Sequence, residues 1–264
     1  TDHMGGAIQL ADRLPVLNFI DHGTTVDQGE RPGAAFERYV ALRDGAAHRT
    51  VRPGDRVPVD GLDVRVIASD GDVLTAPLTG AGQSNPFCED FAFHGQDILS
   101  RYGDAEDQQS VSTFVGFGRF RTVIMGDLTW NKEHPLMCPD NKLGTVDLYL
   151  VSHHGSDTSG SAALVQALQP RAAVMNNGPR KGGGPQTFAM LDTVVGLEDL
   201  WQNHYAVPVG DANRPDRFIA NLQDFAPNND PANDNDDEAI HLGEAHWIHI
   251  AARRDGSFTV TNSR

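Results

Sequence analysis

The chain has 264 residues, 39% of them hydrophobic, so it can bury a core, and we expect one α/β domain over residues 1–264. Its formal net charge of −15 repels phosphate polymers, which disfavours broad nucleic-acid binding but leaves room for a local metal-lined site that takes a phosphoester. No run of eighteen apolar residues occurs, so we expect neither a transmembrane helix nor a membrane partner.

Apolar periodicity predicts an alternation of helices and strands along most of the chain. The first part is predicted to form a helix over 7–14, a strand over 16–20, a helix over 34–42, and strands over 64–68 and 112–117. The second part is predicted to form strands over 121–125 and 147–151, a helix over 162–168, a strand over 172–175, and strands over 246–251 and 257–260. This alternation predicts a layered sheet-and-helix fold.

Turn residues and composition refine this picture. Gly118 separates two apolar runs, which indicates a hairpin that ends at Gly126-Asp127. Asp255-Gly256 indicates a second hairpin near the end of the chain. Residues 224–238 consist almost entirely of Asp, Asn, Pro and Ala, so we expect a flexible acidic loop there.

Three short segments place metal-binding side chains where strands end. They are Asp2-His3, Gly126-Asp127 and the pair His153-His154. A carboxylate at a sheet edge can bridge two cations, and neutral imidazole is a favoured zinc ligand. Mixed His and Asp ligation with an open position suits catalytic zinc, which lowers the pKa of bound water to about 7.

These segments resemble the signature of the metallo-β-lactamase superfamily. Its first motif is His-x-His-x-Asp-His, whose last three positions match Thr1-Asp2-His3. An apolar strand ending in Gly126-Asp127 and the segment His153-His154-Gly155-Ser156 match two later motifs in order. The last motif, with the helix, proline and strand after it, is similar to the competence-protein branch, which includes the hydrolase domain of DNA-uptake channels. The resemblance covers roughly residues 1–191.

The resemblance implies an αββα sandwich, here lacking its first strands, and a site for two zinc ions. Asp127 would bridge the metals, and Asp2, His3 and His153 would bind the second one. His154 would lie beside that metal and contact the substrate or the leaving group. The alternative, in which His154 is the ligand in place of His153, stays open because successive strand residues point to opposite faces.

The chain departs from the family pattern in two places. The first two histidines of the signature are expected just upstream of Thr1, so the chain is expected to begin inside the motif and to lack most ligands of one metal. The competence branch carries Gly-His-Pro where this chain reads Gly183-Gly184-Pro185. A histidine that often contacts substrate is therefore missing.

Further candidate substrate-binding residues follow two predicted strands. His22 comes just after the strand over 16–20 and is predicted either to line the pocket or to be a polar turn residue. Asn176, Asn177 and Lys181 follow the strand over 172–175 in a glycine-rich segment. Their amides and positive charge are suited to an anionic substrate, and the alternative is an ordinary glycine-rich loop.

The function expected on these grounds is a zinc-dependent hydrolase in which a metal-bound hydroxide attacks an ester, amide or phosphoester. The competence-like motif favours a phosphodiesterase or nuclease. The acidic surface and the missing Gly-His-Pro histidine favour a lactonase or β-lactamase acting on a small molecule. A non-catalytic binding module that keeps the fold is a third hypothesis, and the intact ligand positions argue against it.

Cys88 and Cys138 are the only two cysteines, and each lies next to a proline in a loop-like setting. If they pair, the protein is expected to be exported or periplasmic; if they are free thiols, a cytoplasmic location is expected. Their spacing does not match a structural zinc site. The sequence leaves both alternatives open.

Overall fold

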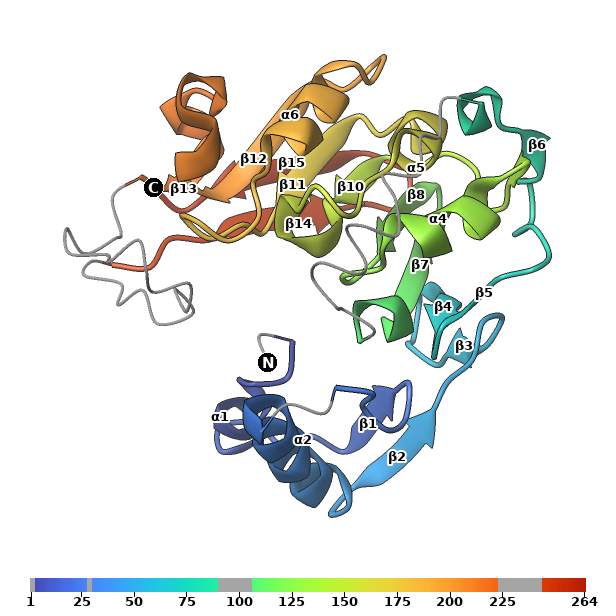
Figure 1. Ribbon diagram of the computed structural model, residues 1–264, viewed down its shortest axis with the longest axis vertical. Coiled ribbons are helices and arrows are strands. Elements are labelled where there is room, and N and C mark those ends of the chain that lie inside the picture. The colour runs from blue at the N-terminus through green and yellow to red at the C-terminus, as the bar shows by residue number, and fades with distance from the viewer. Residues whose placement is uncertain (1–2, 28–29, 90–105, 223–243) are drawn as a thin grey trace.

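The computed structural model describes residues 3–27, 30–89, 106–222 and 244–264 (Figure 1). Asp2 and the acidic loop expected over 224–238 therefore lie outside the described residues. No helix in the described ranges combines the length and the apolar character that crossing a membrane requires. The fold is a mixed α/β arrangement, as the alternation of patterns predicts.

A nine-stranded sheet forms the centre of the molecule, with the strand order β13-β12-β11-β10-β8-β7-β4-β3 and β5 paired to β4. Its strands are β3 (Arg56–Val57), β4 (Asp63–Ser69), β5 (Asp72–Val73), β7 (Ser112–Phe117), β8 (Phe120–Ile124), β10 (Leu148–Leu150), β11 (Ala172–Met175), β12 (Asp199–His204) and β13 (Ile219–Asn221). The strands from β13 to β8 are parallel, whereas β7, β4 and β3 continue antiparallel. The ends of β8, β10 and β11 consequently share one edge with the start of β7.

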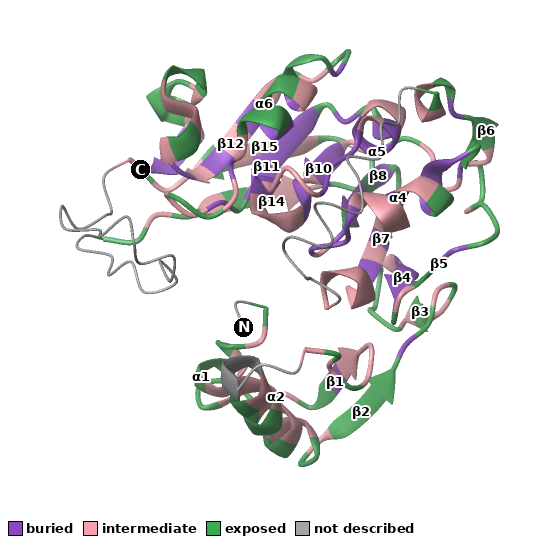
Figure 2. Ribbon diagram, viewed as in Figure 1, coloured by how far each residue is buried: buried purple, intermediate pink, exposed green. Residues whose placement is uncertain are grey.

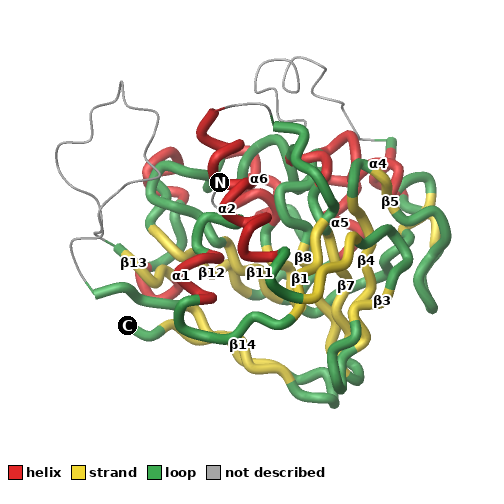
Figure 3. The backbone as a smooth tube through the Cα atoms, turned by 90° about the horizontal axis from the view of Figure 1, so that it is seen from below, coloured by secondary structure: helices red, strands yellow, loops and turns green. Residues whose placement is uncertain are grey.

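Helices α4 (Trp130–Met137), α5 (Ala162–Leu168) and α6 (Pro185–Asp192) cover one face of this sheet. The hairpin of β14 (Ile248–Ala252) and β15 (Phe258–Asn262) covers the other (Figure 3). Side chains alternate between the two faces, so Tyr149 packs in the helix-side core while Leu148 packs against the hairpin. Fully burying such a side chain contributes roughly 1.5–3 kcal/mol.

The first elements form a separate layer below the sheet in Figure 1. They are α1 (Ala7–Ala11), β1 (Asn18–Asp21), α2 (Glu30–Arg43) and β2 (Ala47–Thr50), and β1 pairs in parallel with β2 alone. Asp21 accepts hydrogen bonds from Tyr39 (2.9 Å), Arg43 (3.1 Å) and His48 (2.8 Å), which tie these elements together. Much of this layer is exposed (Figure 2).

Most predicted elements are confirmed, three of them with unchanged bounds: β7, α5 and β11. Both predicted hairpins form, β7 with β8 and β14 with β15. The predicted helix over 7–14 is shorter, and its Leu10 and Leu14 side chains are 51% and 57% exposed, so its apolar stripe does not face the core.

A further two-stranded pairing and a disulfide lie beyond α4. Strand β6 (Gln83–Ser84) pairs with β9 (Asp140–Asn141), and Cys88 forms a disulfide with Cys138. The bond joins the 3-10 turn over Pro86–Cys88 to the end of α4. Of the two alternatives for the cysteines, the structure has the paired one.

Candidate metal centre

Asp127 lies at the edge of the sheet where β8 ends. Gly126 turns the chain with φ +61°, and the Asp127 amide donates to the Ser110 hydroxyl (3.1 Å). The next residue, Leu128, is fully buried and anchors the segment below the sheet edge. Helix α4 begins only at Trp130 with Thr129 as its N-cap residue, so Asp127 does not cap that helix. Its carboxylate is thereby left for other contacts.

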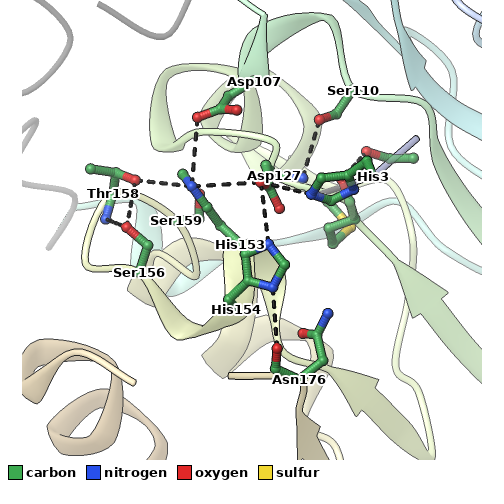
Figure 4. A network of polar contacts seen from close by, with 12 residues as sticks. His3, Asp107, Ser110, Asp127, His153, His154, Ser156, Thr158, Ser159 and Asn176 are labelled. Atoms are coloured by element: carbon green, nitrogen blue, oxygen red, sulfur yellow. Dashed lines mark hydrogen bonds and ion pairs between the residues drawn. The ribbon is translucent and has the colours of Figure 1, made fainter. Parts of the chain in front are cut away.

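His153 and His154 form a tight turn that is separated by two residues from the end of β10. Both residues are left-handed, with φ of 50° and 56°, which costs about 1 kcal/mol for each non-glycine residue. The turn is held because the His153 amide donates to the Gly126 carbonyl at 2.9 Å. Since the two residues do not continue as a strand, they do not point to opposite faces, and both rings reach toward Asp127 (Figure 4).

Two groups of potential ligands share Asp127. One group is His3, Asp127 and His154, the other is Asp107, Asp127 and His153, and within each the ligand atoms lie within 4.8 Å of one another. Oδ2 of Asp127 faces all three rings: it lies 2.9 Å from His3 Nε2, 3.6 Å from His153 Nε2 and 3.6 Å from His154 Nε2. The shared atom is thus a single carboxylate oxygen.

Asp107 completes the second group and was not predicted. It precedes β7 in the short 3-10 helix Asp107–Gln109, and its Oδ2 lies 3.6 Å from His153 Nε2. A signal for it exists in the sequence: the hairpin around Gly118 is antiparallel, so residues just before Ser112 must lie beside those just after Met125. Asp107 and Asp127 meet for this reason.

The spacing of Asp127 from His153 and His154 fits a divalent cation, whereas His3 Nε2 lies at a hydrogen-bond distance from Asp127, 2.9 Å. Two ligands about 2.1 Å from one zinc ion and at a tetrahedral angle lie about 3.4 Å apart. The distance of 3.6 Å from Asp127 to His153 or His154 is near this value and is longer than a hydrogen bond. Nitrogen and carboxylate ligands suit zinc, and they also suit other first-row metals, so the donor set alone does not select one.

The charge of Asp127 is strongly favoured in this setting. Burial raises the pKa of its carboxyl, but contacts with His154 and His3 outweigh that effect, and the charge of His153 adds to them. The net result is a pKa well below the usual range of an aspartate. Asp127 is therefore ionised at neutral pH, as a metal ligand must be.

The structure brings most of the predicted ligands together. His3 and Asp127 lie in contact, whereas Asp2 is outside the described residues. His154, rather than His153, shares a group with His3, and His153 is grouped with Asp107. The division of roles between the two histidines stays a prediction.

His22 lies beside the centre rather than within it. Its Nε2 is 3.0 Å from Glu106, the residue before Asp107, and Glu106 also accepts from the Thr25 hydroxyl (2.8 Å) and the Val26 amide (2.7 Å). These contacts fasten the N-terminal layer to the segment that carries Asp107. A role of His22 in substrate binding stays a prediction.

Asn176, Asn177 and Lys181 follow β11 and differ in their surroundings. The Asn176 carbonyl lies 3.2 Å from His154 Nδ1 and so orients that ring with Nε2 toward Asp127. Asn177 is 1% exposed and donates to the His204 carbonyl at 2.8 Å, which makes it a structural residue of the loop. Lys181 is exposed in the turn, and its carbonyl accepts from the Gly178 amide.

The glycine-rich loop is fastened directly to the histidine turn. The amides of Gly183 and Gly184 donate to the carbonyls of His154 (2.9 Å) and Gly155 (2.8 Å). Gly182 has φ +68°, and a Cβ atom there would lie 2.0 Å from the His154 carbonyl oxygen. Gly183 and Gly184 thus hold the histidine turn through their backbone.

Gly182→Ala is expected to lower the free energy of unfolding by about 3 kcal/mol, since the new methyl group must displace the backbone of His154. Gly80→Ala is the matched control, because Gly80 has φ +86° but a Cβ atom there would have no neighbour within 4 Å. It should cost only the backbone strain, about 1 kcal/mol. Urea unfolding compares the two variants, and equal losses would refute the close approach of Gly182 to His154.

A buried carboxylate, Glu133 of α4, lies behind the centre. It is fully buried, and burial raises its pKa to about 7. Hydrogen bonds from the amides of Ser161 and Gly160 lower the pKa but do not outweigh the effect of burial. Because the folded state holds this proton more tightly than the unfolded chain, its contribution to stability is present below pH 4.5 and is lost as the pH rises through 7.

Glu133→Gln should remove this pH dependence. The free energy of unfolding of the wild type, relative to that of the variant, is expected to fall by about 3 kcal/mol between about pH 4.5 and about pH 8. Urea unfolding at several pH values measures the difference. A difference that is constant with pH would contradict the raised pKa.

A large open pocket of 1310 Å³ lies at the other end of the sheet. Phe114 and Arg121 line it, together with residues of the 76–87 segment, and none of the candidate ligands does. The candidate ligands and this pocket therefore lie at separate places in the molecule.

No protein-family model matches the sequence, and no curated protein matches it. The fold and the centre on their own define an α/β protein with a His/Asp cluster that is able to hold a metal ion.

Proposed function

We propose that this chain is a zinc-dependent hydrolase of the metallo-β-lactamase superfamily, with an αββα sandwich and a centre for two metal ions. The observation that carries the proposal is the pair of ligand groups that share the Asp127 Oδ2 atom. A structural metal site is usually closed by four protein ligands, whereas three in each group leave a position for water or substrate. This favours catalysis over a structural role.

The residues have distinct parts in the proposed reaction. Asp127 would be a ligand of both cations, with His3 and His154 as the further ligands of one and Asp107 and His153 as those of the other. When bound, zinc would supply Lewis-acid chemistry and a water whose pKa is lowered to about 7. The Asn176 carbonyl would keep the His154 ring oriented toward Asp127.

The test is hydrolysis of bis-p-nitrophenyl phosphate, nitrocefin and an acyl-homoserine lactone, each with zinc and with a chelator. Turnover of at least one compound that disappears with chelator is expected. The compound cleaved separates a phosphodiesterase from a β-lactamase or a lactonase. If all three rates stay at background with zinc bound, the proposal fails for these substrate classes, and a binding module becomes the better explanation.

A further inference from the structure

Glu133 uses both carboxylate oxygens to hold the backbone of the loop after the histidine turn. Oε1 accepts from the Gly160 amide at 2.7 Å, and Oε2 accepts from the Ser161 amide at 2.8 Å. The side chain is 0% exposed. Carboxylates are seldom fully buried, and burial of one is costly unless its oxygens are hydrogen-bonded. Both oxygens therefore bind the backbone of two consecutive residues, Gly160 and Ser161.

The two residues just before Gly160 carry the hydroxyls that contact His153. The hydroxyls of Thr158 and Ser159 lie 3.1 Å and 3.2 Å from His153 Nδ1 (Figure 4). A partner on one ring nitrogen fixes the tautomer and the direction of the other nitrogen. Nε2 of His153 is the atom that faces Asp107 and Asp127.

We infer that Glu133 is a positioning residue of the metal centre, which acts on the metal through His153. It fixes the loop over 158–161 so that the two hydroxyls hold the imidazole with Nε2 toward Asp127. Glu133 lies on α4, which begins three residues after Asp127. The same helix therefore follows the shared ligand Asp127 in the chain and, through Glu133, positions the second ligand His153. The inference rests on the proposed metal site but concerns a residue outside it.

Above pH 7, where Glu133 is ionised, both of its oxygens can accept from the two N–H donors of Gly160 and Ser161. Glu133→Gln keeps the shape of the side chain but turns an NH₂ group toward one of the two amides, so one hydrogen bond is lost and one donor faces another. The variant therefore loosens the loop without removing a ligand of the proposed centre.

A double-mutant cycle with His153→Ala tests the inference, with zinc affinity measured by chelator competition. Glu133→Gln is expected to weaken zinc binding about tenfold in the wild-type background, as loss of an outer partner of a ligand typically does. In the His153→Ala background, where His3, Asp127 and His154 remain, its effect should shrink to less than about twofold. A general loss of structure would weaken binding equally in both backgrounds.

Asn141→Ala is the matched control. Asn141 is also buried, at 7% exposure, and its Oδ1 accepts from two backbone amides, those of Leu143 and Gly144, at 2.9 Å each. Its Nδ2 donates to the carbonyls of Gly144 and Ala167, at the far end of α5 from the loop over 158–161, so this variant should lower the melting temperature but keep the zinc affinity. Equal losses of zinc affinity in Asn141→Ala and Glu133→Gln would overturn the inference, as would equal effects of Glu133→Gln in both backgrounds.

Amide hydrogen exchange of the metal-free protein separates this inference from the proposed function. Glu133→Gln should speed exchange at Gly160 and Ser161 by at least about tenfold. If exchange there is unchanged, the inference falls whether or not zinc binds; if the wild type binds no zinc, the proposed function falls. If Glu133→Gln does not fold, Thr158→Val serves instead, because it removes one of the two hydroxyls that contact His153 Nδ1. It should weaken zinc binding in the wild-type background but not in the His153→Ala background.

Discussion

Asp127→Asn is expected to abolish metal binding at both ligand groups. The substitution keeps the size of the side chain but removes the charge of the one oxygen that faces His3, His153 and His154. Loss of an outer partner of a ligand costs 10- to 100-fold in metal affinity, so loss of a shared ligand should lower zinc affinity by more than about 1000-fold. The rate of any zinc-dependent hydrolysis should fall with it. Chelator competition and metal analysis measure the effect.

Asp63→Asn is the control for this substitution. Asp63 is a half-exposed carboxylate on the far strand β4, paired with Arg56 (3.4 Å) and Arg65 (3.0 Å). An exposed pair contributes at most about 1 kcal/mol, so zinc content and activity should stay at the wild-type level. If Asp127→Asn keeps its zinc as Asp63→Asn does, Asp127 is not the shared ligand.

Removal of the Cys88–Cys138 disulfide is expected to lower the free energy of unfolding by about 4 kcal/mol, the loop-closure entropy for a separation of 50 residues. The bond closes the part of the chain that carries both Asp107 and Asp127, so its loss should also loosen the spacing of these ligands. Urea unfolding of the Cys88→Ala/Cys138→Ala variant tests this. A urea midpoint equal to that of the wild type would contradict this expectation. Unfolding of the wild type in the presence of a reductant measures the same loss without a substitution.

The sequence predicted the part of the centre that follows from strand ends. An apolar strand before Gly126 and a second one before Ser152 are parallel neighbours in the sheet, so their last residues meet. The histidine pair was harder to predict in detail, because the turn is left-handed at both positions and strand alternation does not apply there. Only the local backbone decides which ring faces which partner.

Strand β12 was not predicted because two of its three buried side chains are polar, and β13 has only three residues, of which the last is a buried asparagine. Gln202, His204 and Asn221 are buried where a sheet usually carries apolar residues. Gln202 donates to Asn213 (2.7 Å) and accepts from the Arg214 amide (2.8 Å), both from the loop 11 and 12 residues further along the chain. A hydrophobic pattern cannot reveal such strands, since the partners that make the polar burial possible come from the tertiary fold.

Anomalous diffraction at the zinc edge, from crystals of the protein grown with zinc, tests the central claim most directly. Two peaks are predicted on either side of the Asp127 carboxylate, each about 2.1 Å from its Oδ2. One should lie near His3 and His154, the other near Asp107 and His153. A zinc-loaded crystal with no peak within about 3 Å of Asp127 would contradict the assignment of this cluster as the metal centre.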